Sequence, residues 1–213
     1  MKNLLSVVTI FCLSIAAANA NEQDTVDRSA VTIKEFRHMP EKGLPRRILR
    51  NARGVAIISV VKAGFIFSGK AGEGVVVART RYGWSGPSFI GTGGAGWGLQ
   101  IGAEVTDFVI VLNNEAAVRA FSRGGNVTLG ADASVAAGPV GRAAEADVTP
   151  KAAIYTYSKS KGLFVGVSLE GAVIGTRKGA NEHYYGRPVT ANDILHGRAA
   201  APAGAASLRA ALR

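Results

Sequence analysis

The chain contains few residues of the kinds that most directly indicate chemistry: it has one cysteine and three histidines among 213 residues. A lone cysteine, Cys12, cannot form an internal disulfide, so stability must come from a buried core, which a chain of this length can form. The histidines, His38, His183 and His196, lack the paired spacing of a metal site. We therefore expect no metal and no cofactor.

Long apolar runs are also missing. The longest covers residues 4–15 and is too short for a membrane-spanning helix. It follows a cation, Lys2, and precedes Ala-Asn-Ala at 18–20, which is typical of a cleavage site. This pattern predicts a signal peptide over residues 1–20, which would remove Cys12. We expect an exported protein, periplasmic or envelope-associated, with an uncleaved anchor as the alternative.

Acidic residues are scarce, with 15 Asp and Glu against 25 Lys and Arg, a net charge of +10. Loss of Lys2 with the signal peptide leaves +9. A surplus of this size favours an anionic partner, either nucleic acid or a membrane surface. Export argues against nucleic acid and favours anionic lipid or polysaccharide. The alternative is that the charge only keeps the protein soluble.

One stretch matches a nucleotide-binding fingerprint. Gly91, Gly93 and Gly96 fit G-x-G-x-x-G, but such a loop must end a strand and open a helix. Here Gly98 and β-branched residues follow, which disfavours a helix. Glycine at every second position over 94–98 instead predicts a strand with one bare face.

Other catalytic patterns fail as well. No glycine precedes Lys-Ser or Lys-Thr, so there is no P-loop, and Ser85 lacks G-x-S-x-G spacing. Glu104 and Asp107 are three apart, which places them on opposite faces of a strand. We expect each to be solvated or in a salt bridge, and we predict that the chain is not an enzyme.

Apolar residues at helical spacing predict helices near both ends of the chain. Apolar residues recur at Val26, Ala30, Ile33 and Phe36, which predicts a helix that Pro40 ends. Pro45 opens a second, shorter helix before Gly54. Further helices are predicted over 113–125, with Asn113 or Asn114 as the cap, and over 190–195, with Thr190 as the cap. Residues 198–213 are expected to form an alanine-rich tail, with a flexible linker at 198–204 and a short terminal helix or disorder at 207–213.

The residue pattern in the middle of the chain predicts strands. The runs 54–61, 72–79 and 104–112 are β-branched and bounded by turn residues. Residues 126–138 also read as strand, and 152–177 as strands separated by a polar turn at 159–162. These patterns predict an α+β fold, a single β-rich domain whose antiparallel sheet is barrel-like or a sandwich, with flanking N- and C-terminal helices. We expect a helical segment over 21–43 and the domain over 44–197.

The basic helix is the strongest candidate site. Arginines flank an Ile-Leu stripe, a pattern typical of a helix at a membrane interface, where each cation adds about 1 kcal/mol. The alternative is a surface helix whose apolar residues pack on the sheet while its arginines face water; both can hold together. The candidate lipid-binding residues are Lys42, Leu44, Arg46, Arg47, Ile48, Leu49, Arg50 and Arg53.

Two weaker candidates remain. Lys159, Lys161 and Lys62 could form a second cationic patch in hairpin turns, although solubility is the favoured explanation for them. Trp84 or Trp97 could anchor at an interface, whereas core packing over bare glycine faces is the alternative.

Five segments carry a resemblance to a known family. They cover 44–79 ("LPRRILRNARGVAIISVV" and onward), 83–112 ("GWSGPSFIGTGGAGWG" and onward), 127–142, 157–174 and 181–195 ("NEHYYGRPVTANDIL"). In this order they resemble the SYLF domain family over 44–197. The resemblance implies phospholipid binding, with phosphatidylinositol phosphates in eukaryotic members, to which the basic N-terminal segment contributes. Some eukaryotic members also bind actin, which we do not expect of an exported protein.

The sequence therefore favours a non-enzymatic domain that binds anionic phospholipid at a membrane surface in the bacterial envelope. The alternative is an envelope scaffold that binds a protein partner and no lipid.

Overall fold

The computed structural model describes residues 22–39, 43–132, 134–139, 152–162 and 172–213, without the side chains at 64–68, 95–102 and 161–162. The predicted signal peptide, residues 1–20, lies outside the described residues. No described helix is long and apolar enough to cross a membrane.

The chain begins with the two predicted helices. Helix α2 (Glu22–His38) buries Val26, Ala30, Ile33 and Phe36, because residues at this spacing share one helical face. Helix α3 (Arg46–Asn51) starts after Pro45 as expected and buries Leu49.

A long hairpin forms the centre of the fold. Strand β1 (Gly54–Thr80) and strand β3 (Ser88–Leu112) are antiparallel from the pair Gly54/Leu112 to the pair Val76/Ser88. Strand β2 (Gly83–Trp84) closes the turn between them. The two runs predicted as separate strands, 54–61 and 72–79, are thus halves of one 27-residue strand.

Strand β1 folds back on itself, so that its two halves run side by side. The Arg79 amide donates to the Arg53 carbonyl at 2.8 Å. A Cβ placed on Gly74 would overlap the Ile57 carbonyl oxygen, and one on Gly72 would lie 2.9 Å from the Ser59 oxygen. Glycine is therefore required where the two backbones approach most closely.

Four shorter strands extend this sheet: β4 (Asn126–Thr128), β5 (Val135–Ala137), β6 (Ile154–Gly162) and β7 (Val173–Thr176). Strand β6 pairs with β3, β5 pairs with β6 in parallel, and β7 pairs with β3 and β4. The antiparallel prediction is confirmed apart from the parallel pair. The predicted turn at 159–162 is wrong, because these residues continue β6 opposite Glu104–Asp107.

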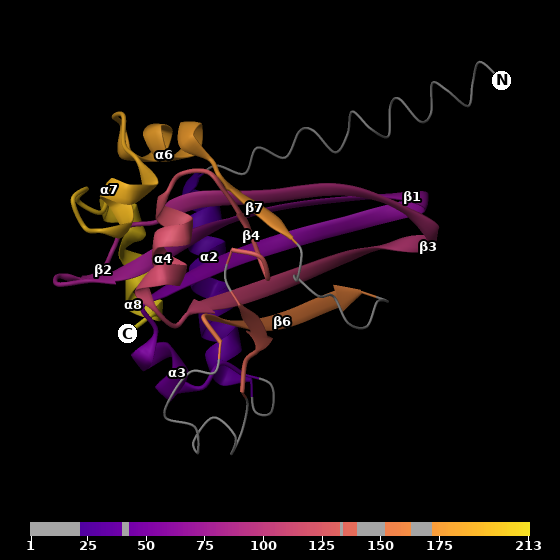
Figure 1. The fold of residues 1–213 in the computed structure, drawn as a ribbon, viewed down its shortest axis with the longest axis horizontal. Coiled ribbons are helices and arrows are strands. Elements are labelled where there is room, and N and C mark those ends of the chain that lie inside the picture. Colours follow the sequence, from indigo (N-terminus) through magenta and orange to yellow (C-terminus); the bar gives the residue numbers. More distant parts are fainter. Residues whose placement is uncertain (1–21, 40–42, 133, 140–151, 163–171) are drawn as a thin grey trace.

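The sheet has a hydrophobic cluster on each face. Val55, Ile57, Val75 and Val77 pack with α2, whereas Ala56, Ile58, Val76 and Ala78 pack with α4 (Glu115–Ser122). Since alternate residues of a strand point to opposite faces, α2 and α4 cover opposite faces (Figure 1). The predicted α+β class with flanking helices is confirmed.

Helix caps follow the sequence prediction. The Asn114 side chain accepts from the Ala117 amide and caps α4. Thr190 and Asp193 form a reciprocal capping box at α7 (Ala191–Leu195), an arrangement that satisfies two backbone donors at once. Helix α6 (Lys178–Tyr185) ends at Gly186, whose φ is 64°, in the left-handed region that favours glycine.

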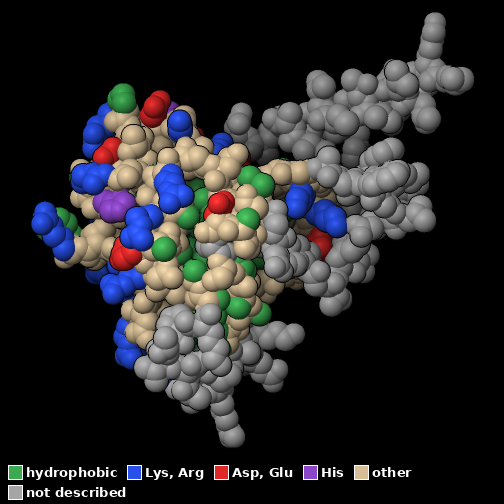
Figure 2. All heavy atoms as spheres, viewed as in Figure 1, with side chains coloured by type: hydrophobic (Ala, Val, Ile, Leu, Met, Phe, Trp, Pro, Cys, Tyr) green, Lys and Arg blue, Asp and Glu red, His purple; other side chains and the backbone are tan. Residues whose placement is uncertain are grey.

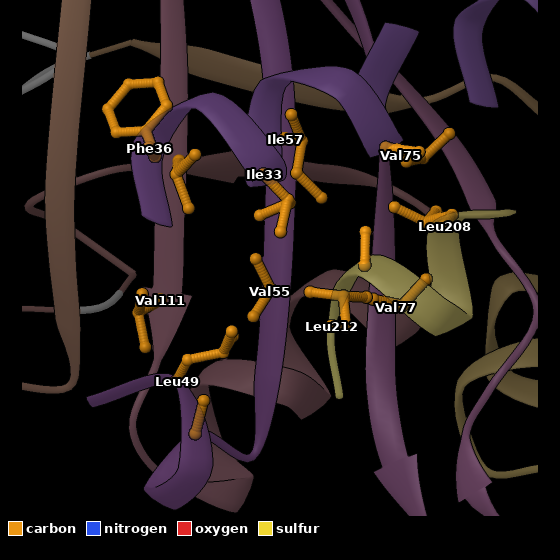
Figure 3. Close-up of a cluster of buried hydrophobic side chains, with 14 of the residues drawn as sticks. Ile33, Phe36, Leu49, Val55, Ile57, Val75, Val77, Val111, Leu208 and Leu212 are labelled. Atoms are coloured by element: carbon orange, nitrogen blue, oxygen red, sulfur yellow. The ribbon is translucent and has the colours of Figure 1, made fainter. Parts of the chain in front are cut away.

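The C-terminal segment packs onto the core through η1 (Ala203–Ala205) and α8 (Ala206–Ala211). Leu208, Ala211 and Leu212 are at most 3% exposed and join the cluster under α2. Figure 3 shows Leu208 and Leu212 beside Val75 and Val77. The terminal residues thus form the short helix that was one of the two expectations for 207–213, and Leu208 and Leu212 are spaced to bury one of its faces.

The nucleotide-like glycines lie in β3. Gly91, Gly93 and Gly96 pair with Glu73, Ala71 and Ser68 of β1. The strand prediction is confirmed: no helix follows these glycines, so no helix N-terminus is placed to bind a phosphate.

Candidate functional site

Helix α3 presents its apolar residues to the core. Leu44 and Leu49 are 2% and 3% exposed, and Ile48 is partly buried against the same cluster. In Figure 3, Leu49 points toward Val55 and Val111 of the sheet. The apolar half of the predicted lipid site is thus core, which agrees with the alternative of a surface helix packed on the sheet.

The arginines of α3 instead help to form a pocket of about 390 Å³. It lies between α2, α3, the end of β1 and α8, and no acidic side chain of the described residues lines it. We call it the arginine pocket, after the five arginines that line it: Arg37, Arg46, Arg50, Arg79 and Arg213.

Two of these arginines are held by backbone carbonyls. Arg37 Nη1 donates to the Ala211 oxygen at 2.7 Å. Arg79 donates from Nε to the Ala52 oxygen at 3.1 Å and from Nη2 to the Leu49 oxygen at 3.3 Å. The acceptors lie at or near the C-terminal ends of α8 and α3, where unpaired carbonyls favour cations.

Arg79 is also stacked on an aromatic ring. Its guanidinium carbon lies 4.4 Å from the Trp84 ring centroid, a cation–π contact. Burial, and then the charge of Arg53, lower the pKa of Arg79. Burial is the larger of the two causes, so the lowered pKa reflects first the partial loss of solvent around the guanidinium group.

Arg46 and Arg50 complete the pocket from α3. They are one helical turn apart and therefore share a face, and both are exposed. Within the described residues neither forms an ion pair, unlike Arg53, which lies 3.9 Å from Glu115. Figure 2 shows further Lys and Arg side chains along the edge formed by α7, β2 and α3.

The remaining predicted residues are placed less centrally. Lys42 lies outside the described residues, and Arg47 is half-buried and does not line the pocket. Arg53 follows the helix and sits away from the pocket beside Glu115. The structure thus brings together Arg46, Arg50 and the buried Leu49 from the predicted set.

Sequence reasoning missed three members of the pocket, Arg37, Arg79 and Arg213. They come from α2, β1 and the C-terminus, far apart in the chain. Only the packing of α8 against α2 brings them to α3. No local pattern could have identified them, although each arginine follows or adjoins a buried apolar residue.

The other candidates have structural roles. Lys159 lies within β6 and pairs with Glu35 at 2.7 Å, whereas the Lys161 side chain lies outside the described part. Trp84 is 5% exposed and its Nε1 donates to the Leu212 oxygen. It is a core residue, as the alternative held. The Trp97 side chain is not described.

Glu104 and Asp107 are buried, with exposures of 2% and 9%. The expectation that they are solvated is wrong. Asp107 accepts from Ser59 Oγ at 2.5 Å, and Glu104 accepts from Thr106 Oγ1 at 3.1 Å. The described residues contain no group of His, Cys, Asp and Glu that could hold a metal ion.

Comparison with known proteins identifies relatives of the whole domain. The family model Ysc84, described as Las17-binding protein actin regulator, matches residues 93–213. Protein YSC84 of Saccharomyces cerevisiae is 52% identical over 164 residues, covering 75% of this chain and 35% of that protein. The human SH3 domain-containing YSC84-like protein 1 is 45% identical over 197 residues, covering 89% of this chain and 58% of that protein.

A third relative, LAS seventeen-binding protein 3 of Saccharomyces cerevisiae, is 52% identical over 164 residues, covering 75% of this chain and 36% of its own length. This chain thus spans between about a third and three fifths of the relatives it matches. Their names are those of binding and regulatory proteins. With a family match over more than half of its length and relatives this similar, the chain belongs to the Ysc84 family, the SYLF-type domain family that its motifs resemble.

Proposed function

We propose that this domain binds anionic phospholipid at a membrane surface, without enzymatic activity, through the arginine pocket and the cationic edge around it. The observation that carries the proposal is five arginines around one pocket that no described acidic side chain lines. A guanidinium group matches phosphate geometry through paired N–H donors.

Two arginine side chains of the pocket are already held in place before an anion binds. Arg37 and Arg79 are fixed by hydrogen bonds to carbonyl oxygens, so little side-chain entropy remains to be lost when they bind. Arg46 and Arg50 are exposed at the rim and can close on a headgroup. Each cation near an anionic membrane surface contributes about 1 kcal/mol.

The buried leucines limit how the domain can bind. Leu44 and Leu49 are part of the core, so α3 has little apolar surface for insertion unless it detaches from the sheet. We therefore propose peripheral, mainly electrostatic contact. Such contact weakens with salt, because the Debye length falls from about 10 Å at 0.1 M to about 3 Å at 1 M.

The membrane that we propose is the bacterial envelope, reached through the predicted signal peptide. Phosphatidylglycerol and cardiolipin would then be the available anionic lipids. This part of the proposal rests on the sequence pattern of residues 1–20. N-terminal sequencing of the protein isolated from its own cells tests it, since cleavage after Ala20 is expected.

Vesicle co-sedimentation tests lipid binding. The purified protein should sediment with vesicles containing phosphatidylglycerol and remain in the supernatant with phosphatidylcholine alone. Arg46→Glu with Arg50→Glu should reduce binding at least about tenfold, because four units of charge change next to the surface. Both residues are exposed, so the fold should persist.

The matched control is Lys178→Glu with Arg187→Glu, which changes the net charge equally at α6, the opposite end of the molecule from α3 in Figure 1. Binding close to wild type is expected. Equal losses in both double variants would show a response to net charge alone. Binding that is indifferent to salt would contradict the electrostatic mechanism.

A protein partner is the second candidate, because the family description names Las17 binding and actin regulation. In this case the sheet or the cationic edge would contact a protein, and the domain would act as a scaffold. Co-sedimentation with filamentous actin, and gel filtration of the protein alone, distinguish the two candidates. Export would place the domain away from actin, so we expect no actin binding.

A further inference from the structure

A second surface, independent of the arginine pocket, has the character of a ligand site. It is a groove of about 920 Å³ beside α2, over the face of the sheet. Four of the five exposed large hydrophobic residues of the described chain line it: Val31, Val61, Val105 and Val173. Apolar side chains gathered in one concavity mark a binding site more than the same residues scattered singly.

The groove exists because its floor lacks side chains. Gly91, Gly93 and Gly175 line it together with Ala71. A Cβ on Gly93 would meet nothing nearer than the Lys70 oxygen at 3.9 Å. The absence of a side chain at Gly93 therefore leaves open space above the sheet. Close packing does not require glycine at this position.

The backbone beneath the groove is already hydrogen-bonded. Strands β1, β3 and β7 pair there through Ser59/Asp107, Val61/Val105, Glu73/Gly91 and Gly91/Gly175. A peptide that binds by strand addition needs a free sheet edge. This groove offers the paired face of a sheet, so an occupant without hydrogen-bonding demands, such as a hydrocarbon chain, fits it better.

Among the described residues, most charged side chains around the groove are paired with one another, whereas Arg28 is not. Glu35 pairs with Lys159 at 2.7 Å, and Glu73 pairs with Arg177 at 3.0 Å. Asp107 accepts a hydrogen bond from Ser59 Oγ, a neutral donor. Arg28 lies one helical turn before Val31 on the same side of α2 and makes no ion pair within the described chain.

From this geometry we propose that the groove binds one long-chain fatty acid. The hydrocarbon chain lies over the glycine floor between Val31 and the pair Val61/Val105, and the carboxylate is held by Arg28. The size agrees with small-molecule sites, which are typically about 300–1,000 Å³ and mostly apolar. The proposal does not depend on the arginine pocket, which lies around α3.

The test is fluorescence titration of the full chain with cis-parinaric acid, followed by displacement with saturated fatty acids below their aggregation limits. One site per chain is expected. Each added CH₂ in the competitor should tighten binding about fourfold, the effect of burying one methylene. Arg28→Gln should weaken binding of the fatty acid and leave binding of the matching alcohol unchanged.

Gly93→Leu should fill the groove from its floor and reduce affinity at least about tenfold. Gly179→Leu is the matched control, because a Cβ there meets nothing within 4 Å and the residue lies on α6, outside the groove. Val31→Asp, at a position that is 53% exposed, provides a second variant that should fold. Thermal melting verifies the fold of each.

Retained affinity in Gly93→Leu or Val31→Asp would overturn the proposal, as would the absence of binding in the wild type. A dimer in gel filtration that Val31→Asp dissociates would also overturn it, since a second copy would then be the occupant. Gly93→Leu should still sediment with phosphatidylglycerol vesicles, and Arg46→Glu with Arg50→Glu should still bind cis-parinaric acid. The two proposals therefore fail separately.

Discussion

The Asn181 side chain in α6 accepts the hydrogen bond of the Phe89 backbone amide at 2.7 Å, 92 residues earlier in the chain. Its Nδ2 donates to Ser88 Oγ at 3.2 Å, and the residue is 0% exposed. This contact fixes α6 against the start of β3. It compensates for a strand end that would otherwise leave a buried amide without a partner.

Asn181→Ala should therefore lower the free energy of unfolding by about 2–3 kcal/mol, because the Phe89 amide stays buried and unpaired. Urea denaturation measures the effect. Asn192→Ala, on the exposed side of α7, is the control and should cost less than about 1 kcal/mol. A loss in Asn181→Ala no greater than in the control would show that water replaces the side chain.

The fold-back of β1 predicts a large cost at one glycine. Gly74→Ala would push a methyl group into the Ile57 carbonyl, and backbone cannot move aside as a flexible side chain can. We expect about 3 kcal/mol of destabilisation, the upper range for overpacking. Gly69→Ala in the same strand meets nothing within 4 Å and should change the thermal midpoint little. Similar midpoints for both variants would contradict the close approach.

Because the C-terminal segment packs on the core, a leucine in α8 should contribute as much to the free energy of unfolding as a leucine in the central sheet. Leu208 is fully buried in the cluster under α2. Leu208→Ala should cost about 2–5 kcal/mol, the range for a large-to-small change in a core. Ser207→Ala, at the exposed neighbour, should cost less than about 1 kcal/mol. Chemical denaturation that is unaffected by Leu208→Ala would restore the flexible-tail interpretation.

The raised pKa of Tyr184 predicts part of the loss of stability at alkaline pH. Burial, and then the negative charge of Asp27, raise the pKa of Tyr184 from 10.0 to about 12. A raised folded pKa gives stability that is complete below pH 10 and lost as pH rises from about 10 to 12, where the unfolded chain ionises first. In Tyr184→Phe, the free energy of unfolding should fall less over this interval.

Urea titrations at pH 9 and pH 12 measure that difference. Tyr82→Phe removes a tyrosine that is 69% exposed and should keep the wild-type dependence. An identical alkaline slope in wild type and Tyr184→Phe would mean that Tyr184 ionises equally easily in both states.

Much of the local structure was predictable. The spacing of Val26, Ala30 and Ile33 identified α2, and the capping residues Asn114 and Thr190 identified α4 and α7. These signals depend on neighbours within one or two turns of chain, so sequence alone contains them. The alternation of Gly94 and Gly96 likewise indicated a strand, whereas the literal fingerprint Gly91-Gly93-Gly96 indicated a loop.

The predicted turn at 159–162 was wrong because the conformation of these residues depends on contacts with other elements and not on neighbours in sequence. Lysine and serine there look like turn residues, but pairing of Asp107 with Lys159 in the ladder, and the ion pair of Lys159 with Glu35, hold them in β6. Tertiary contacts override local preference when partners come from other elements. The same cause made Glu104 and Asp107 buried residues.

The sequence by itself determined the class of the fold, helices α2, α3, α4 and α7, the basic character of α3 and the family. Only the tertiary structure decided that Leu44 and Leu49 belong to the core and that Arg37, Arg79 and Arg213 join Arg46 and Arg50 around one pocket. The physical reason is that periodicity reports which residues share a face of one element. Which surface that face meets depends on the folded-back hairpin and on the docking of α8, whose parts are far apart in the chain.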